Sequence, residues 1–213
     1  DGRGIGIAIL DSAIYDAHHM FYGSNGQKRV ETKEFEGGGK EDKFGHGTHV
    51  AAIAAGRGGK PGDLLSGLVL QNYQGIAPEA KIIAVRVLKN NGTGSAAKLI
   101  EALDWVYENR TSKNIRVVNL SLGTPAIETW RNDPLCRAVR RLTAAGVVVV
   151  AAAGNNGKTA SGQKIYGAIH SPGNDPSVIT VGATNTFNTN VRSDDGVATY
   201  SSRGPTRSYY TDA

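Results

Sequence analysis

The sequence has a single cysteine among its 213 residues, Cys136, together with one methionine and two tryptophans. One cysteine cannot form a disulfide within the chain, which excludes a small fold held together by disulfides and leaves secretion open. The sequence also has no uninterrupted apolar run of the roughly 20 residues that a membrane-spanning helix needs. We therefore expect no membrane partner.

Blocks of basic residues are absent too, although 24 Lys and Arg against 19 Asp and Glu give a net charge of +5. The basic residues are scattered among acidic ones, as on a solvated surface, so we expect no nucleic-acid partner. The 28 glycines follow no fixed period, which excludes a collagen-like chain. Length and composition indicate one domain, residues 1–213. The 213 residues contain no signal peptide, and the abrupt first and last residues lead us to expect a mature form or a fragment.

Short apolar runs alternate with amphipathic segments along the chain. Strands buried on both faces are predicted at 5–10, 81–88, 117–121, 147–153 and 178–183, with short strands near Val30 and Phe35. Helices are predicted at 46–56, at 95–109 and from Asp133-Pro134 to Gly146, and a glycine-rich loop at 57–75. The alternation predicts an α/β fold, a three-layer αβα sandwich with a mainly parallel sheet.

Polar residues follow several of these strands, and open α/β sheets bind ligands beyond the carboxyl ends of their strands. Asp11 follows the first strand, and Asn155 follows the fourth. His46 begins a predicted helix, where the helix dipole favours a neutral ring that is able to accept a proton. Asp11 would orient such a histidine, and the Asn155 amide would donate to a developing oxyanion, as in a hydrolytic site.

Each of these residues also has a simpler interpretation. Asp11 could cap a turn, His46 could be a surface residue, and Asn155 could serve a left-handed turn. A zinc site is not favoured, because His46 and His49 are three residues apart with no acidic residue between them. A nucleotide-binding site is not favoured either, because no glycine-rich phosphate loop opens a helix after a strand.

Several longer motifs narrow the choice. Gly45-His46-Gly47-Thr48-His49-Val50-Ala51 resembles the histidine motif of the subtilisin-like serine proteases (subtilases, peptidase family S8). Five further segments are similar to family motifs and follow in family order: Ile9-Leu10-Asp11-Ser12, Asn119-Leu120-Ser121-Leu122-Gly123, Ala152-Ala153-Gly154-Asn155, Pro172-Gly173 through Val181-Gly182-Ala183, and Tyr200-Ser201-Ser202-Arg203-Gly204-Pro205. Together they run from near residue 5 to residue 205, almost the whole chain.

The resemblance implies a serine endopeptidase that acts on proteins or peptides and is secreted. Asp11 would orient His46, His46 would be general base and then general acid, and Asn155 would stabilise the oxyanion. The substrate would lie extended between Gly92–Ala96 and Ser121–Gly123. The residues implied to bind it are Gly92, Thr93, Gly94, Ser121, Leu122, Gly123, Ala153 and Gly154. The pocket motifs are typical of a cleft that tolerates apolar side chains.

The chain departs from the family pattern in two places. Ala13 stands where the family usually has glycine after the Asp-Ser pair, so we expect a backbone that avoids positive φ at this residue. The Gly-Thr-Ser-Met-Ala stretch that carries the family's nucleophile does not occur in the 213 residues. We therefore expect an incomplete catalytic domain that is inactive alone, with the serine in a missing C-terminal segment that also covers part of the sheet.

The motifs are compatible with a second function and with a bound ion. A pseudo-protease or peptide-binding module would keep the same cleft without the chemistry, so it is the alternative to a fragment of an active protease. The resemblance requires no cofactor for the chemistry but implies a structural calcium ion. Candidate ligands lie in loops without ligand spacing: Asp42, Asp63, Asp194 and Asp195.

Overall fold

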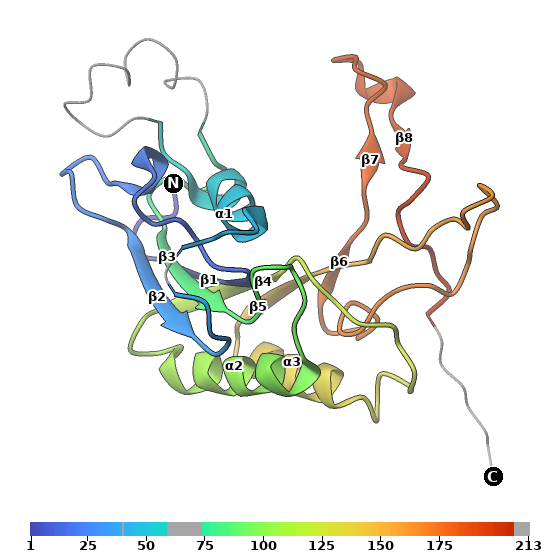
Figure 1. Ribbon diagram of the computed structural model, residues 1–213, viewed down its shortest axis with the longest axis horizontal. Coiled ribbons are helices and arrows are strands. Elements are labelled where there is room, and N and C mark those ends of the chain that lie inside the picture. The colour runs from blue at the N-terminus through green and yellow to red at the C-terminus, as the bar shows by residue number, and fades with distance from the viewer. Residues whose placement is uncertain (40, 59–73, 207–213) are drawn as a thin grey trace. The chain divides into compact units, whose positions relative to one another are not determined.

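A computed structural model of the chain describes residues 1–39, 41–58 and 74–206 (Figure 1). Most of the glycine-rich loop predicted at 57–75 lies outside the described residues. The chain forms two compact units, Asp1–Asn119 and Leu120–Ala213. The single domain expected from the sequence stays a prediction. None of the described helices combines the length and the apolar character that crossing a membrane requires.

The first unit is built on a parallel sheet. Its strands lie in the order β2 (Val30–Glu34), β3 (Lys81–Arg86), β1 (Gly6–Asp11) and β4 (Ile115–Leu120). β1 and β3 run in register from Gly6 opposite Lys81 to Asp11 opposite Arg86. Every residue of β1 is buried, as expected for an apolar strand covered on both faces. A single strand, β2, replaces the two short strands predicted near Val30 and Phe35.

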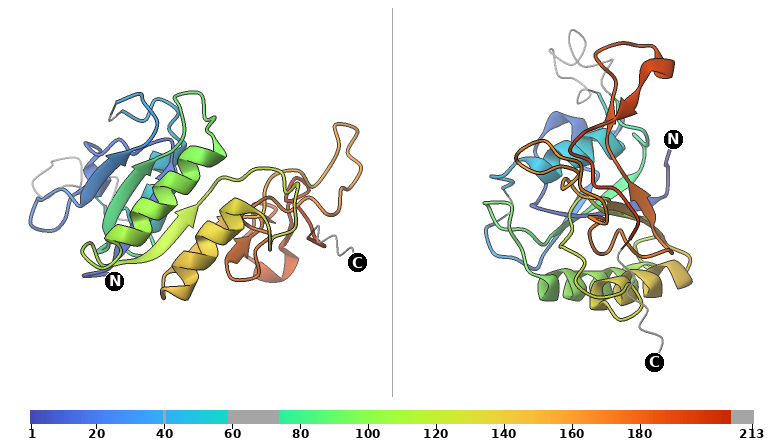
Figure 2. Two further views of the ribbon diagram at one scale, coloured as in Figure 1. Left: turned by 90° about the horizontal axis from the view of Figure 1, so that it is seen from below. Right: turned by 90° about the vertical axis from the view of Figure 1, so that its right-hand side faces the viewer.

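Two helices cover this sheet from opposite sides, so the first unit has the expected three layers (Figure 1). Ile7 and Ile9 point to one face of β1, where they form a core with Ala51 and Ala55 of α1 (His46–Ala55). The other face is covered by α2 (Ala96–Asn109), which lies in front of the strands and runs roughly along them in the view from below (Figure 2).

The position of α2 follows from its sequence. Ser95 is the N-cap, and its hydroxyl accepts a hydrogen bond from the Lys98 N–H at 3.3 Å. The buried residues recur at helical spacing and are Leu99, Ala102, Leu103 and Val106. The helix predicted at 95–109 is confirmed.

The second unit contains a shorter parallel pair, β5 (Val148–Ala152) with β6 (Ile179–Val181). Helix α3 (Pro134–Ala144) packs on β5. Asp133 is its N-cap and accepts hydrogen bonds from the N–H groups of Leu135 and Cys136, as predicted. Gly146, with φ +82°, ends this helix where the sequence predicts.

The remaining elements are short and carry no strong local pattern. Two are single turns of 3-10 helix, η1 (His19–Phe21) and η2 (Arg192–Asp194). Two are strands of an antiparallel pair, β7 (Thr184–Asn185) and β8 (Gly196–Val197). Several apolar side chains of the second unit are exposed: Val148, Ile179 and Val181 are 46%, 57% and 50% accessible.

Candidate active site

Asp11 and His46 are brought together in the first unit. β1 ends at Asp11, whose side chain is 1% exposed, and α1 begins at His46, whose side chain is 42% exposed. The His46 Nδ1 atom lies 2.8 Å from Asp11 Oδ1 and 2.9 Å from Oδ2. The Ser12 N–H donates to Asp11 Oδ1 at 2.7 Å. The imidazole is thus held through one nitrogen, while much of the ring remains accessible to a reaction partner.

Burial is the dominant influence on the Asp11 carboxyl. Desolvation raises its pKa, because a charged carboxylate is poorly solvated inside the protein. Hydrogen bonds from His46 and Ser12, and the attraction of the imidazole, act in the opposite direction but do not cancel this effect. The carboxylate therefore depends on these few donors for its charged form.

The distance between Asp11 and His46 depends on a close contact at Gly47. A Cβ atom on Gly47 would lie 2.1 Å from the Ala13 carbonyl oxygen and 3.1 Å from the Asp11 Cβ. Only glycine therefore allows the first turn of α1 to approach the end of β1 so closely. Gly45, two residues before Gly47, has φ +83° and is the N-cap of α1.

Asp42 fixes the start of α1. Its carboxylate accepts hydrogen bonds from the Gly45 N–H at 3.0 Å, the Thr48 N–H at 2.8 Å and the Thr48 hydroxyl at 2.6 Å. It also accepts one from the Ser12 hydroxyl at 2.8 Å, and Ser12 Oγ accepts one from the Gly47 N–H at 3.1 Å. Burial alone would raise the pKa of Asp42, but these donors outweigh it and lower the pKa. The network joins the residues on both sides of His46 to the residue after Asp11.

Arg86, at the end of β3, holds the loop that carries Asp42. Its side chain is fully buried and donates to the carbonyl oxygens of Gly39 at 2.6 Å and Glu41 at 3.3 Å. It also donates to Asn90 Oδ1 at 2.6 Å. Because all these acceptors are satisfied by one buried guanidinium, the loop on either side of residue 40 has a defined path toward α1.

The expectation for Ala13 is wrong. The sequence predicts a backbone that avoids positive φ, whereas Ala13 has φ +136° and is 3% exposed. The chain turns sharply after Asp11, and this turn directs the Ala13 carbonyl oxygen against Gly47. The alanine therefore adopts a conformation that normally favours glycine, and its methyl group is buried there.

The segment Gly92–Gly94 forms a tight turn beside the Asp11–His46 pair. Gly94 makes an antiparallel bridge with Leu88, whose N–H donates to the Asp11 carbonyl oxygen at 3.2 Å. Gly92 has φ +77°, and a Cβ there would lie 2.3 Å from the Phe44 ring. The extended edge expected for Gly92–Ala96 ends at Gly94, because Ser95 caps α2 and Ala96 begins it.

The other expected site residues lie in the second unit. Ser121, Leu122 and Gly123 follow β4, and the next residue, Thr124, forms an antiparallel bridge with Ser171. Ala153 follows β5 and donates its N–H to the Val181 carbonyl at 2.8 Å, and Gly154 has φ +103°.

Asn155, next to Gly154, is exposed. Within the part of the chain that the structure describes, its side-chain amide makes no hydrogen bond and is free to donate. This is what an oxyanion donor requires.

Several residues with a structural role in the two units are not predictable from local sequence patterns. The sequence marks Asp42 only as a candidate calcium ligand, although an Asp shortly before a helix start is also a capping signal. Phe44 beside His46, and Asn156 with His170 in the second unit, carry no local signal. Their contacts join segments that are distant in the sequence.

No group of three His, Cys, Asp or Glu residues suited to a metal ion occurs in residues 1–39, 41–58 and 74–206. Asp42 has its carboxylate occupied by four donors, and the Asp194 carboxylate accepts from the Thr189 hydroxyl. Asp63 lies outside the described residues.

Comparison with known proteins agrees with the motifs. A sequence model of the subtilase family matches residues 2–211. The chain is 37% identical to serine protease AprX of Bacillus subtilis (strain 168), over 96% of this chain and 44% of that protein. It is 33% identical to subtilisin E of the same organism, over 88% of this chain and 42% of that protein.

The solved structure of sphericase superposes on 95% of this chain and 60% of its own, with a TM-score of 0.74 and 33% identity. The solved structure of the S41 psychrophilic protease also superposes on 95% of this chain and 60% of its own, with a TM-score of 0.72. These similarities confirm the expected three-layer α/β fold. The chain spans less than half the length of the two curated relatives.

Proposed function

The chain belongs to the subtilase family of serine proteases, and we propose that it supplies the acid–base pair and the oxyanion donor of a serine endopeptidase. The observation that carries this proposal is the pair of contacts between His46 Nδ1 and the Asp11 carboxylate, at 2.8 and 2.9 Å. A buried carboxylate behind an accessible imidazole is the arrangement by which histidine activates a hydroxyl nucleophile.

In the proposed reaction, His46 Nε2 takes the proton of a serine hydroxyl as the serine attacks the peptide carbonyl carbon. Asp11 accepts from Nδ1–H, which fixes the tautomer and stabilises the imidazolium. The Asn155 amide donates to the oxygen that becomes negatively charged. His46 then gives its proton to the leaving amine, and water releases the acyl group by the same steps.

The serine is proposed to come from a segment outside these 213 residues. The sequence contains no Gly-Thr-Ser, and the chain covers 44% of AprX. The chain by itself is then inactive, because the acid–base pair has no nucleophile to activate. The proposed substrates are extended peptides that pair with the Gly92–Gly94 and Ser121–Gly123 segments.

Two further proposals, on location and on a bound ion, rest only on membership of the family. We propose an extracellular location for the whole protein. We also propose that a bound calcium ion has only a structural role, so that the chemistry requires no cofactor. Chelation with EDTA that lowers the melting temperature would support the ion, and an unchanged melting temperature would contradict it.

The proposal is tested by cleavage of a fluorogenic peptide with the longer protein that contains this chain. The wild type cleaves the peptide, and His46→Ala lowers kcat by about the 10⁶-fold seen for the histidine of a related subtilisin triad. His49→Ala is the matched control, because His49 is an exposed histidine one turn further along α1, and we expect it to retain activity. Peptide binding without cleavage by the wild type would contradict the proposal and favour a pseudo-protease.

A further inference from the structure

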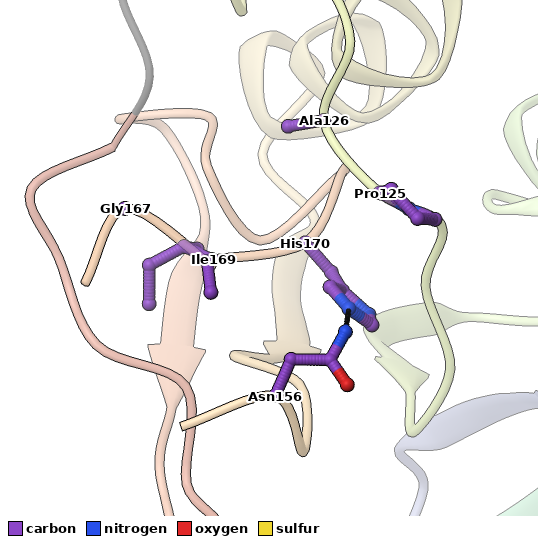
Figure 3. A pocket seen from close by; sticks show the side chains of 7 residues that line it. Pro125, Ala126, Asn156, Gly167, Ile169 and His170 are labelled. Carbon is purple, nitrogen blue, oxygen red and sulfur yellow. Dashed lines mark hydrogen bonds between the residues drawn. The ribbon is translucent and has the colours of Figure 1, made fainter. Parts of the chain in front are cut away.

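A small pocket lies within the second unit, between three segments of the chain (Figure 3). Its volume is about 140 Å³. Pockets for whole small molecules are usually about 300–1,000 Å³, so this one is of a size for a single side chain. Its lining residues are Pro125, Ala126, Asn156, Gly167, Ala168, Ile169 and His170.

The backbone places His170 between the two segments proposed to bind substrate in this unit. The His170 N–H donates to the Ala153 carbonyl oxygen at 3.0 Å. The next residue, Ser171, exchanges two hydrogen bonds of 2.9 Å with Thr124, which directly follows Gly123. Main-chain contacts therefore hold His170 to both of these segments.

The His170 side chain fills the space between two glycines. A Cβ on Gly154 would lie 2.9 Å from His170 Cγ and 3.0 Å from Cδ2. A Cβ on Gly123 would lie 2.9 Å from His170 Cβ and 3.4 Å from Nδ1. The imidazole thus packs against the backbone of Gly123 and Gly154, where larger residues would clash with it.

Asn156 holds the ring in place. Its Nδ2 atom lies 2.8 Å from His170 Nε2, and Figure 3 shows the amide nitrogen directed at the ring. With the amide assigned this way round, Nε2 accepts and a neutral ring carries its proton on Nδ1. Burial lowers the pKa of His170, which favours this neutral form. Nδ1 lies on the Gly123 side of the ring.

We propose that His170, held by Asn156, determines which substrate side chain enters the pocket that Pro125, Ala126, Asn156 and His170 line, next to Ser121–Gly123 and Ala153–Gly154. The imidazole shortens the pocket and offers an N–H donor. The pocket then takes a short side chain with a hydrogen-bond acceptor, such as Asn or Asp, and excludes Phe, Tyr and Trp. This inference rests on the proposed protease function and names its substrate class.

The experiment uses the longer protein and a set of fluorogenic peptides that differ only in the residue before the cut: Ala, Asn, Asp, Leu and Phe. For the wild type, we expect kcat/KM to be at least about 10-fold higher with Asn than with Phe, a range that a single pocket contact can supply. In His170→Gly the Phe peptide gains at least about 10-fold relative to Asn, because the space of the ring becomes available. His170→Ala is measured in parallel, because alanine adds less backbone freedom than glycine does. We expect it to shift the Phe-to-Asn ratio of kcat/KM in the same direction.

Two more variants separate the size of the ring from its hydrogen bonding. Asn156→Ala keeps the ring but frees it, so Phe stays excluded while the preference for Asn over Ala falls. Lys164→Ala is the control, because Lys164 is exposed in the same unit and does not line the pocket. Melting temperatures show that each variant is folded.

The outcomes distinguish this inference from the proposed function. If the wild type cleaves peptides but both His170 variants keep its Phe-to-Asn ratio within two-fold, the inference is overturned and the protease function stands. If the folded wild type cleaves none of the peptides or a denatured protein substrate, the protease function fails, and the inference fails with it.

Discussion

The Asp11 Oδ1 atom accepts hydrogen bonds from two directions, from the Ser12 N–H at 2.7 Å and from His46 Nδ1 at 2.8 Å. The carboxylate is therefore held by its own backbone as well as by the imidazole. The imidazole is fixed in turn by the start of α1, which Asp42 and Gly47 hold against the end of β1. The acid–base pair is thus assembled within the first unit, without a substrate.

The first prediction concerns the charge of Asp11. In Asp11→Asn the side-chain NH₂ can donate to His46 Nδ1, which places the ring proton on Nε2, where it cannot accept a proton from serine. We expect kcat of the longer protein to fall by about 10⁴-fold, the scale known for this change in a serine protease triad. Asp16→Asn is the control, because Asp16 forms a partly exposed ion pair with Lys28. A loss below 10-fold in Asp11→Asn would contradict the assigned role.

The second prediction concerns the pH dependence of stability. The pKa of Asp11 in the folded protein is raised above its ordinary value of 3.8 by burial, so the folded state holds this proton more tightly than the unfolded state. Stability of the wild type relative to Asp11→Asn therefore falls as pH rises from 3.8 through the folded pKa, and levels off above it. Urea unfolding of both proteins across this range measures the difference. A relative stability that rises with pH would contradict the raised pKa.

The third prediction concerns the network around Asp42. Asp42→Ala removes the acceptor of four hydrogen bonds at the start of α1, so we expect a loss of about 1–2 kcal/mol in the free energy of unfolding. Because the folded pKa of Asp42 is lowered, its contribution is present above 3.8 and is lost as pH falls through the folded value. The exposed neighbour Glu41→Ala should stay within about 0.5 kcal/mol of the wild type. Equal unfolding midpoints for the two variants would refute this role.

The fourth prediction concerns the backbone at Ala13. Relief of the positive φ in Ala13→Gly stabilises by about 1–3 kcal/mol. The loss of one buried methyl and the greater freedom of glycine in the unfolded chain offset about 1–2 kcal/mol of this. We expect the variant to be as stable as the wild type or slightly more stable. Ala51→Gly, a fully buried alanine in α1, should cost about 2 kcal/mol. Thermal unfolding that shows equal losses for both would rule out strain at Ala13.

Much of the fold is predictable because its signals are local. β1 and β3 are short apolar runs, α2 shows helical spacing behind a serine cap, and Asp133 caps α3. Asp11 and His46 are also recognisable, because strand ends and helix starts of a parallel sheet are where polar groups gather.

The conformation of Ala13 is not predictable in this way. It results from the approach of α1 to the end of β1, which depends on Gly47, 34 residues later. The role of Asp42 depends on a loop whose path is set by the buried Arg86. His170 and Asn156 meet because the His170 N–H binds the Ala153 carbonyl oxygen, which brings the segment after β5 beside His170. These features arise from tertiary contacts, and local sequence patterns carry no information about such contacts.

The most direct test of the central claim is labelling of the longer protein with a fluorophosphonate probe, followed by peptide mass spectrometry. The probe reacts covalently only with an activated serine. We predict one labelled serine outside residues 1–213, no label in His46→Ala, and no label on the 213-residue chain alone. A labelled serine within residues 1–213, or labelling that persists in His46→Ala, would contradict the claim that Asp11 and His46 activate a nucleophile from another segment.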